Sequence, residues 1–276
     1  MGRRLTECAL TRGDRVTATA RRATALEDLA QEYGDQLAVE VLDLTRPEDV
    51  DRVVRKVAAT DPVDILVNNA GFAVVGAAEE MTVEQIRAQL EVMLIAPMLI
   101  TRAFLATMRE QGGGRIIQIS SMGGQVAIPT HSSYHAAKWG LEGFSESVAR
   151  EVAGFGIHIT IVEPGGTRTG FVNALNYTAE SETYRDGPVG RIRRELREAD
   201  ASALTGDPER IADAVYETTR LDQPPLRLTL GADSYDAVHA ALSERLTALE
   251  TQRAQAESVA FNHPAVAGDQ NPTTDA

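Results

Sequence analysis

Short runs of apolar, mostly β-branched residues alternate along the chain with longer segments in which apolar residues recur at helical spacing. Several of the short runs are almost continuously apolar, which is typical of parallel strands covered on both faces. The pattern predicts an α/β fold, a doubly wound parallel sheet in a single domain. The short runs lie at 15–20, 37–43, 63–69, 115–120, 157–163 and 226–230, and helical spacing is clear at 5–10, 47–59, 82–109, 134–153 and 208–220.

Two regions interrupt this alternation. The segment 170–206 is a long insertion with two tyrosines and an arginine-rich stretch. We expect a substrate lid there, because long insertions in compact domains commonly form lids or are disordered. A helix expected near 235–257 is followed by a polar, proline-containing end. The sequence therefore predicts one domain over 2–258 and a disordered tail over 259–276.

The overall charge narrows the range of partners. A formal net charge of -13 argues against a surface that binds nucleic acid or an anionic membrane. The single Cys8 cannot form an internal disulfide, no apolar run approaches the length of a spanning helix, and no signal peptide is visible. We therefore expect a cytoplasmic protein without nucleic-acid or membrane partners.

The stretch "SSMGGQVAIPTHSSYHAAKWG", residues 120–140, carries the clearest chemical signal. Tyr134 and Lys138 are four residues apart, so they share one face of the helix expected there. A free phenol ionises too far above neutrality for efficient proton exchange, and a neighbouring ammonium lowers the pKa of the phenol. Ser121, at the end of a strand, is placed to hold the substrate oxygen that Tyr134 protonates.

The alternative is that this pair only shares a solvated helix surface. The use of arginine almost everywhere argues against it, since Lys56 and Lys138 are the only lysines. His131 and His135 have the spacing of a metal pair, but no carboxylate or cysteine joins them, so we expect no metal site. The "GGGR" at 112–115 leads into a strand rather than a helix, which is typical of a turn and not of a phosphate loop.

Three motifs occur together: "NNAG" at 68–71, "YHAAK" at 134–138 with Ser121 before it, and "PGGTRT" at 164–169. Together they resemble the short-chain dehydrogenase/reductase family, and the resemblance covers about residues 2–230. It implies a Rossmann-like fold, a nicotinamide cofactor, and hydride transfer to or from the carbon of a carbonyl or an alcohol.

The same resemblance implies roles for individual residues. Tyr134 would be the acid and base, Lys138 together with the cationic nicotinamide would lower its pKa, Lys138 would also bind the ribose, and Ser121 would bind the substrate oxygen. The helices at 82–109 and 134–153 would pair across the interface of a homodimer or homotetramer. The residues placed around the cofactor are Gly2 at the pyrophosphate, Asp43 and Leu44 at the adenine, Asn68, Ala70 and Gly71 on the adenosine side, and Pro164, Gly165, Thr167 and Thr169 at the nicotinamide amide.

The end of the strand at 15–20 indicates which nicotinamide cofactor is used. A site for NAD places a carboxylate there for the ribose 2'-hydroxyl, whereas the 2'-phosphate of NADP requires a cation. Ala20 stands at the carboxylate position, and Arg21 and Arg22 follow it. This favours NADP(H), with two solvated loop arginines as the alternative.

The chain departs from the family pattern at its start. Members of the family begin with a strand and a glycine-rich turn, and counting back from Val16 places the last glycine of that turn at Gly2. We therefore expect a sheet without its central strand. Parallel strands buried on both faces cannot lose their middle without leaving backbone groups unpaired, so we expect Met1 to be an internal methionine of a longer protein. The rival is a truncated chain, inactive or unstable.

A second departure is Met93 in "LEVMLIAPM", where the family usually has an asparagine that helps to hold a water of the proton relay. A thioether cannot order that water as a side-chain amide does. We expect slower turnover or a relay through another group.

These observations predict an NADP(H)-dependent oxidoreductase, a ketoreductase that interconverts a ketone or aldehyde with an alcohol. Its small apolar substrate would lie under the lid, near Ile128, Phe171, Tyr177 and Tyr184. The alternatives are a non-catalytic NADP-sensing or scaffolding protein built on the same fold, and an inactive truncated product.

Overall fold

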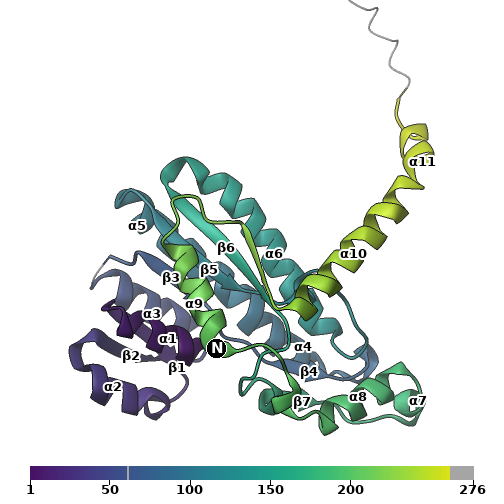
Figure 1. The fold of residues 1–276 in the computed structure, drawn as a ribbon, viewed down its shortest axis with the longest axis horizontal. Helices are drawn as coiled ribbons and strands as arrows, with labels where there is room; N and C mark the ends of the chain where they lie inside the picture. The colour runs from purple at the N-terminus through teal and green to yellow at the C-terminus, as the bar shows by residue number, and fades with distance from the viewer. Residues whose placement is uncertain (61, 262–276) are drawn as a thin grey trace, which may run out of the picture. The chain divides into compact units, whose positions relative to one another are not determined.

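The computed structural model describes residues 1–60 and 62–261, and strands alternate with helices along its first compact unit, 1–238 (Figure 1). The strands are β1 (Val16–Ala20), β2 (Leu37–Val41), β3 (Ile65–Asn68), β4 (Ala73–Val75), β5 (Gly114–Ile119), β6 (Ile157–Pro164), β7 (Leu175–Tyr177) and β8 (Arg227–Leu230). The helices are α1 (Gly2–Thr11), α2 (Glu27–Tyr33), α3 (Pro47–Ala58), α4 (Val83–Leu90), α5 (Ala96–Glu110), α6 (Ser132–Val152), α7 (Glu182–Arg185), α8 (Pro188–Glu198), α9 (Pro208–Thr219), α10 (Ala232–Glu250) and α11 (Arg253–Ser258).

The second compact unit, 239–276, contains the rest of α10 and the short α11. α11 ends at Ser258, close to the end of the domain predicted at 2–258. Of the predicted tail, residues 262–276 lie outside the described residues.

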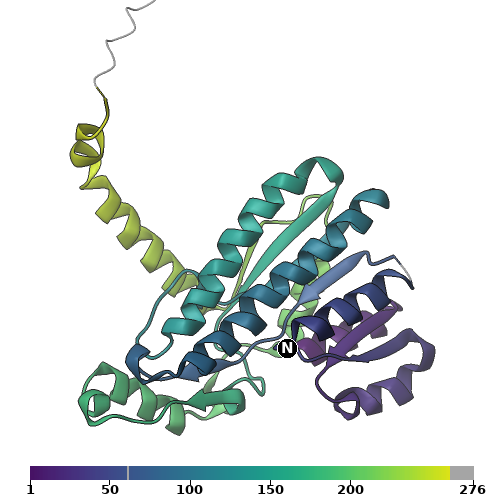
Figure 2. The same ribbon diagram turned by 180° about the vertical axis from the view of Figure 1, so that it is seen from behind.

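The main sheet has the strand order β3–β5–β6–β8, and every pair in it is parallel. Parallel neighbours require crossover connections over the faces of the sheet. Figure 1 shows α1 and α9 on one face, and Figure 2 shows α3, α5 and α6 on the other. This confirms the predicted parallel α/β sheet of Rossmann-like type.

The two-residue period of a strand explains why both faces are apolar. Ile116 of β5 packs with the core beneath α3, α5 and α6, whereas its neighbour Ile117 packs with Ile211 and Val215 of α9. Val162 of β6 joins the second group. Ile116, Ile117 and Val162 are each buried almost completely, so the continuous apolar runs of the sequence fill two separate cores.

β1 and β2 form a parallel sheet of their own, with Val16 paired to Leu37 and Ala20 to Val41. Among the described residues, no backbone ladder joins this pair to β3, the edge strand of the main sheet. Its apolar side chains pack with Leu10 of α1. The strand that the sequence predicts before Gly2 stays a prediction.

The helix predicted over 82–109 contains a π-helical turn, Glu91–Ile95, between α4 and α5. Pro97 lies in the first turn of α5. Because proline has no N–H, it cannot donate to the carbonyl of Met93, which gives the widened turn a physical reason. The sequence pattern predicts the helix but not this turn within it.

The continuous helical stretch Val83–Glu110 has 28 residues and is long and apolar enough, by length and composition alone, to cross a membrane. The expectation that no run reaches spanning length is therefore wrong. In this structure the stretch packs against α3 and α6 and contributes Ala96, Phe104 and Met108 to the main core. Burial against the sheet thus gives its apolar composition a role in a globular domain.

The glycines of the "GGGR" segment form the predicted turn before β5. Gly112 and Gly113 have φ of 88° and 153°, a region that favours glycine. A Cβ at Gly113 would lie 2.8 Å from the carbonyl oxygen of Gly156, so two turns approach each other closely here.

Candidate active site

The three predicted catalytic residues lie together at the carboxyl ends of the central strands. Ser121 follows the end of β5, and Tyr134 and Lys138 lie in the first two turns of α6. The side chain of Ser121 lies close enough to the phenol of Tyr134 to influence its pKa, and Lys138 Nζ lies 5.9 Å from the centre of the Tyr134 ring. The helical spacing therefore places both side chains on one face, as the sequence indicates.

The chain enters α6 through a strained residue. Thr130 has a φ of 78° and is the only non-glycine residue with positive φ in the described part of the chain. It is buried, and its carbonyl accepts a hydrogen bond from the N–H of Gly76 at 3.0 Å. Such strain in a β-branched residue persists only where the surroundings fix the backbone, and it is common at functional sites.

Three rings surround the ring of Tyr134. The ring centres of His131, His135 and Phe171 lie 5.9, 5.8 and 6.1 Å from it. Burial lowers the pKa of His131 to about 4 and also lowers the pKa of His135, so both rings are neutral near pH 7. In these uncharged surroundings burial raises the pKa of Tyr134, although the side chain of Ser121 acts to lower it.

Lys138 is also buried, and its Nζ donates a hydrogen bond to the carbonyl oxygen of Ile119 at 2.6 Å. Burial lowers the pKa of Lys138 to about 8, although the charge of Glu142 acts to raise it. The sequence predicts that Lys138 and a cationic nicotinamide together lower the pKa of Tyr134. In the free protein, removing the phenol from water raises that pKa, and the effect of Lys138 together with the cofactor stays a prediction.

The histidine pair has a structural explanation. His135 Nε2 accepts the N–H of Ile128 at 3.1 Å, and His135 Nδ1 lies 2.8 Å from the carbonyl oxygen of Gly123. His131 Nδ1 lies 2.7 Å from the hydroxyl of Thr130. His135 therefore fastens α6 to the loop after β5. Within residues 1–60 and 62–261, no group of three or more His, Cys, Asp or Glu side chains is arranged to hold a metal ion.

Met93 lies in the π-helical turn and packs in one buried cluster with Tyr134 and Ala137. One turn earlier, the buried Gln89 donates to Met93 Sδ at 3.8 Å and to a backbone carbonyl, and its Oε1 accepts the hydroxyl of Ser133 at 2.6 Å. The side-chain amide of Gln89 thus already has hydrogen-bond partners for both its nitrogen and its oxygen. Met93 acts here as apolar packing against the ring of Tyr134.

The predicted adenosine end of the site lies at the carboxyl ends of β1 and β2. Arg21 and Arg22 follow β1 and are exposed. Asp43 Oδ1 accepts hydrogen bonds from the hydroxyl and N–H of Thr45 at 2.7 and 3.0 Å, and these, more than the charge of Arg21, lower the pKa of Asp43. Leu44 packs against the main core. Two cations and one carboxylate therefore flank this edge.

Gly2 is the first residue of α1 and touches the loop after β3. A Cβ at Gly2 would lie 2.5 Å from Nδ2 of Asn69. Asn68 is hydrogen bonded through its side chain to α5, and Ala70 and Gly71 are exposed. In the described chain the first turn of α1 has no side-chain cap and no acidic residue, so its N–H groups suit the oxygens of a pyrophosphate.

The loop after β6 is held by backbone hydrogen bonds. Pro164 is the last residue of β6, and the N–H of Gly165 donates to the end of β8 at 2.9 Å. Thr167 pairs with Gly206, and Thr169 Oγ1 accepts the N–H of the following Phe171 at 3.3 Å. This loop therefore leads directly into the start of the 170–206 segment and, through the pairing of Thr167 with Gly206, also contacts its end.

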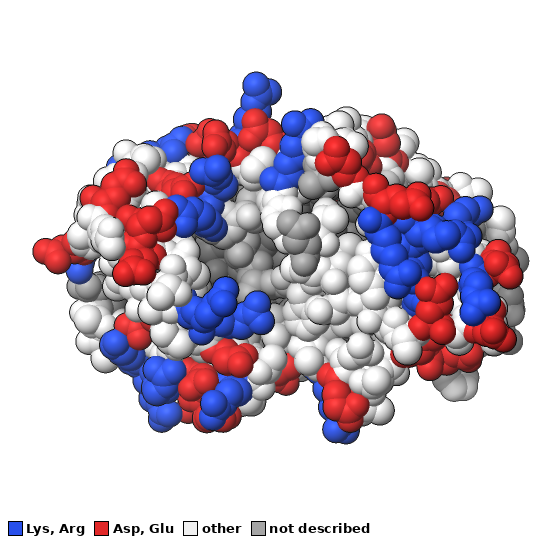
Figure 3. All heavy atoms as spheres, turned by 90° about the horizontal axis from the view of Figure 1, so that it is seen from below, with Lys and Arg blue, Asp and Glu red and all other residues white. Residues whose placement is uncertain are grey.

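The apolar residues predicted around the substrate do not all meet. Phe171 lies beside Tyr134, but Ile128 is 42% exposed. Tyr177 lies under the guanidinium of Arg197 at 4.8 Å, and Tyr184 is hydrogen bonded to Glu79. Figure 3 views the molecule from below, toward the carboxyl ends of the strands, and shows a hollow lined mainly by uncharged residues, with Lys and Arg side chains near its margin.

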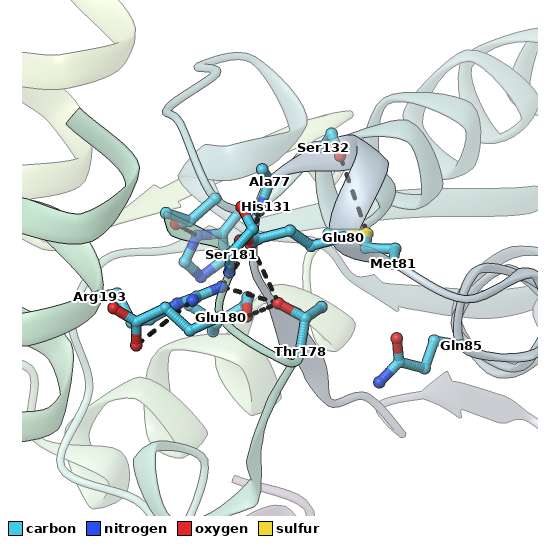
Figure 4. A network of polar contacts seen from close by, with 12 residues as sticks. Ala77, Glu80, Met81, Gln85, His131, Ser132, Thr178, Glu180, Ser181 and Arg193 are labelled. Carbon is cyan, nitrogen blue, oxygen red and sulfur yellow. Dashed lines mark hydrogen bonds and ion pairs between the residues drawn. The ribbon is translucent and has the colours of Figure 1, made fainter. Parts of the chain in front are cut away.

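A buried ion pair fastens the 170–206 segment to the rest of the domain (Figure 4). Arg193 Nη2, on α8, donates to Glu80 Oε2 at 2.6 Å and to the hydroxyl of Thr178 at 2.7 Å. The side chains of Arg193 and Glu80 are 1% and 4% exposed. A two-stranded parallel sheet, β4 with β7, holds the same segment. The predicted lid is thus anchored at two points.

The carboxylate of Glu80 is surrounded by donors. Although burial acts to raise it, the N–H groups of Ser181 and Ala77 and the Arg193 guanidinium lower the pKa of Glu80 to about 2. The stability that this carboxylate contributes is therefore present above its ordinary pKa of 4.5 and is lost as the pH falls toward 2.

Sequence reasoning missed the charged residues buried near the site, Glu80, Glu142, Glu163 and Arg193. One signal was present for Glu142, because it follows Lys138 by four residues and therefore shares the helix face of Tyr134 and Lys138. For Glu80 and Arg193 there was none, since they meet only through the folded 170–206 segment.

Comparisons with known proteins identify the family of the chain. Residues 1–180 match the family model described as short chain dehydrogenase. Oxidoreductase BOA17 of Botryotinia fuckeliana is 36% identical over 242 residues, which cover 86% of this chain and 86% of the relative. The crystal structure of a short-chain dehydrogenase from Streptomyces avermitilis has a TM-score of 0.87 and 38% identity over 94% of this chain and 95% of that chain.

A closed form of serine dehydrogenase complexed with NADP+ is more distant, with a TM-score of 0.67 and 27% identity, covering 83% of this chain and 89% of that one. Taken with the fold and the grouping of Ser121, Tyr134 and Lys138, these matches show that the chain belongs to the short-chain dehydrogenase family and is an oxidoreductase.

Replacing Arg193 by methionine will lower the free energy of unfolding by about 3 to 5 kcal/mol, because Glu80 then stays buried without its cation. Chemical denaturation near pH 7 measures the loss. The matched control is Arg197→Met, whose ion pair with Glu180 is about half exposed and is worth at most about 1 kcal/mol. Equal losses in the two variants would contradict the anchoring role of Arg193.

Proposed function

We propose that this protein is an NADP(H)-dependent oxidoreductase that interconverts a ketone or aldehyde with an alcohol, with Tyr134 as the acid and base. The observation that carries the proposal is the grouping of three side chains: Tyr134 is buried, Ser121 lies near its phenol, and Lys138 Nζ lies 5.9 Å from the centre of its ring. An alcohol or carbonyl oxygen bound at Ser121 would reach a proton donor and a second hydrogen-bond donor at once.

Each residue has a distinct part in the reaction. NADP(H) would supply or accept the hydride. In reduction, Tyr134 gives its proton to the carbonyl oxygen, and in oxidation it takes the proton of the alcohol. Ser121 orients that oxygen, and Lys138 supplies positive charge beside the phenol as it loses its proton. The raised pKa of the buried Tyr134 keeps the phenol protonated in the free protein, the form required for reduction.

The residues at the cofactor positions fit a phosphorylated dinucleotide. The uncapped first turn of α1 suits the pyrophosphate, and the exposed Arg21 and Arg22 suit a 2'-phosphate beyond β1. Lys138 has donors left after its bond to Ile119, and these suit the ribose hydroxyls. The NADP+ in the serine dehydrogenase complex supports the same choice.

The substrate is proposed to be small and apolar around its reacting carbon. Phe171 and the neutral His131 and His135 surround Tyr134 with rings that carry no net charge near neutrality. The segment 170–206 begins beside Phe171 and is proposed to act as the lid over this substrate.

A homodimer or homotetramer is proposed through α4, α5 and α6. These helices carry large apolar side chains at the surface, with Val83 55%, Ile95 37% and Trp139 42% exposed. A shared apolar interface would remove them from water.

Replacing Tyr134 by phenylalanine will lower kcat by about 10² to 10⁴-fold, because the proton donor is removed while the ring remains. Turnover is measured with NADPH over a panel of small ketones and aldehydes, and NADPH affinity is measured by fluorescence. Affinity will change little. The control is Tyr33→Phe on α2. A Tyr134→Phe variant with full turnover would overturn the role of Tyr134, and a wild type without turnover that binds NADPH would favour the sensing alternative.

Replacing both Arg21 and Arg22 by alanine will weaken NADPH binding about tenfold or more and leave NADH binding almost unchanged, since charge-assisted hydrogen bonds to the 2'-phosphate are lost. Titration with each cofactor measures the ratio of the two affinities. The control is Arg55→Ala on α3, where the side chain is exposed and paired with Asp51. An unchanged ratio contradicts the NADP(H) proposal.

A further inference from the structure

Two carboxylates are buried behind the candidate site, and the reaction as derived above does not use either of them. Glu142 lies on α6, one turn after Lys138, and is 3% exposed. Glu163 lies on β6, just before its last residue, and is 0% exposed. Burying two negative charges is costly unless they are paired or protonated, so their partners decide what they can do.

Glu142 is held in one position by its neighbours. Its Oε1 accepts the hydroxyl hydrogen bond of Ser120 at 2.7 Å, and its Oε2 lies 3.4 Å from Arg227 Nε. Gly124 leaves the space that the carboxylate occupies, since a Cβ there would lie 1.8 Å from Glu142 Oε1. Ser120 and Gly124 belong to the same loop as Ser121, so the carboxylate is built into the back of the candidate site.

Glu163 shares the same cation. Its Oε1 accepts a hydrogen bond from Gln125 Nε2 at 2.6 Å and lies 3.4 Å from Arg227 Nε, and its Oε2 accepts the hydroxyl of Thr229 at 2.8 Å. Arg227 therefore stands between two buried carboxylates. Its Nη2 also pairs with Glu146 at 3.1 Å, a residue one turn further along α6 with a 35% exposed side chain.

The other charged and titratable groups near Glu142 come from its own helix, from β6 and from β8. They are Lys138 and Glu146 on α6, Glu163 on β6 and Arg227 on β8. His135, on the same face of α6, is neutral near pH 7 because burial lowers its pKa. The turn after β5 contributes only the uncharged Ser120 and Gln125.

One cation cannot satisfy three carboxylates, so one buried carboxylate favours a proton. Burial raises the pKa of Glu142 to about 7; the hydrogen bond of Ser120 and the charge of Arg227 act against this rise, and the charge of Glu163 adds to it. Glu142 in turn acts on Lys138, because its ionised form favours the ammonium. The two groups thus titrate in neighbouring pH ranges.

We propose that Glu142, held by Ser120 and sharing Arg227 with Glu163, is a positioning residue that sets the protonation state of Lys138. Ionised Glu142 keeps Lys138 in the ammonium form, and neutralised Glu142 releases it to lose a proton at lower pH. Only the consequence for catalysis rests on the proposed function, through the role of Lys138 beside Tyr134. The effect of Glu142 on the charge of Lys138 is independent of that function.

The chain allows a direct test, because Lys138 and Lys56 are its only lysines. With lysine labelled at Cε with ¹³C, an NMR pH titration follows both side chains in the folded protein, and Lys56→Arg assigns the signals. In Glu142→Gln the midpoint for Lys138 will fall by about one pH unit. Lys56, paired with Glu40 at 2.6 Å, serves as the internal reference.

The matched control is Glu146→Gln, which removes a carboxylate from Arg227 but lies a turn further from Lys138. Its Lys138 midpoint will stay near that of the wild type. Equal midpoints for Lys138 in the wild type, Glu142→Gln and Glu146→Gln would overturn the proposal. If Glu142→Gln does not fold, Ser120→Ala replaces it. Loss of the hydroxyl raises the pH at which Glu142 ionises, so the Lys138 midpoint will fall, by a smaller amount than in Glu142→Gln. An unchanged midpoint in Ser120→Ala overturns the proposal.

Stability gives a second readout that needs no ligand. A carboxyl group whose pKa rises from 4.5 to about 7 on folding contributes stability below pH 4.5, and this contribution is lost as the pH rises through 7. Glu142→Gln has no carboxyl group at this position and so cannot lose stability in this way. The difference between its Tm and that of the wild type will therefore increase from pH 5 to pH 8. A purely structural, ionised Glu142 would give a variant that is less stable at every pH in that range.

Turnover separates this proposal from the proposed function. If a ketone or aldehyde is reduced, the basic limb of the kcat profile in Glu142→Gln will move to lower pH together with the NMR midpoint of Lys138. A moved midpoint without turnover in the wild type would contradict the proposed function and support the role of Glu142. Turnover in the wild type, with the Lys138 midpoint and the basic limb unchanged in Glu142→Gln, would support the proposed function and contradict the role of Glu142.

Discussion

The site depends on a polar stripe on α6 that is buried rather than solvated. Tyr134, Lys138 and Glu142 follow one another at four-residue spacing, so one face of the helix presents a phenol, an ammonium and a carboxyl to the ends of β5 and β6. Each group must find a partner or change its protonation state. Ser121, the carbonyl of Ile119, and Ser120 with Arg227 are those partners, and they fix the helix on the sheet.

The same burial acts on Tyr134 and Lys138 in one sense, because it favours the neutral form of each. Removal from water favours the neutral phenol of Tyr134 and lowers the pKa of Lys138 to about 8. Glu142 opposes the effect on Lys138 when it is ionised. The electrostatic balance at the site therefore involves a third residue behind the Tyr–Lys pair, and neutral rings from His131 and His135 leave that balance undisturbed near neutrality.

Local sequence patterns were enough for the sheet and for the grouping of Ser121, Tyr134 and Lys138, because both follow from the periodicity of strands and helices. Burial raises the pKa of Tyr134 in the free protein, and no local pattern predicts this effect, since burial of a side chain is a property of the whole fold. The β4–β7 pair and the Arg193–Glu80 ion pair join segments about a hundred residues apart, and no local pattern encodes such a meeting. The π-helical turn was missed although Pro97, which explains it, stood in the sequence.

Met93 connects these findings. The sequence suggested that without an asparagine at this position a relay would run through another group, and the structure places Met93 as apolar packing against Tyr134, with the nearby amide of Gln89 fully engaged. Lys138 is buried one turn after Tyr134 on the same face of α6, so its ammonium is removed from water. In such surroundings a nearby carboxylate has a larger effect on its charge than it would have in water. Glu142 is that carboxylate, held in place by Ser120.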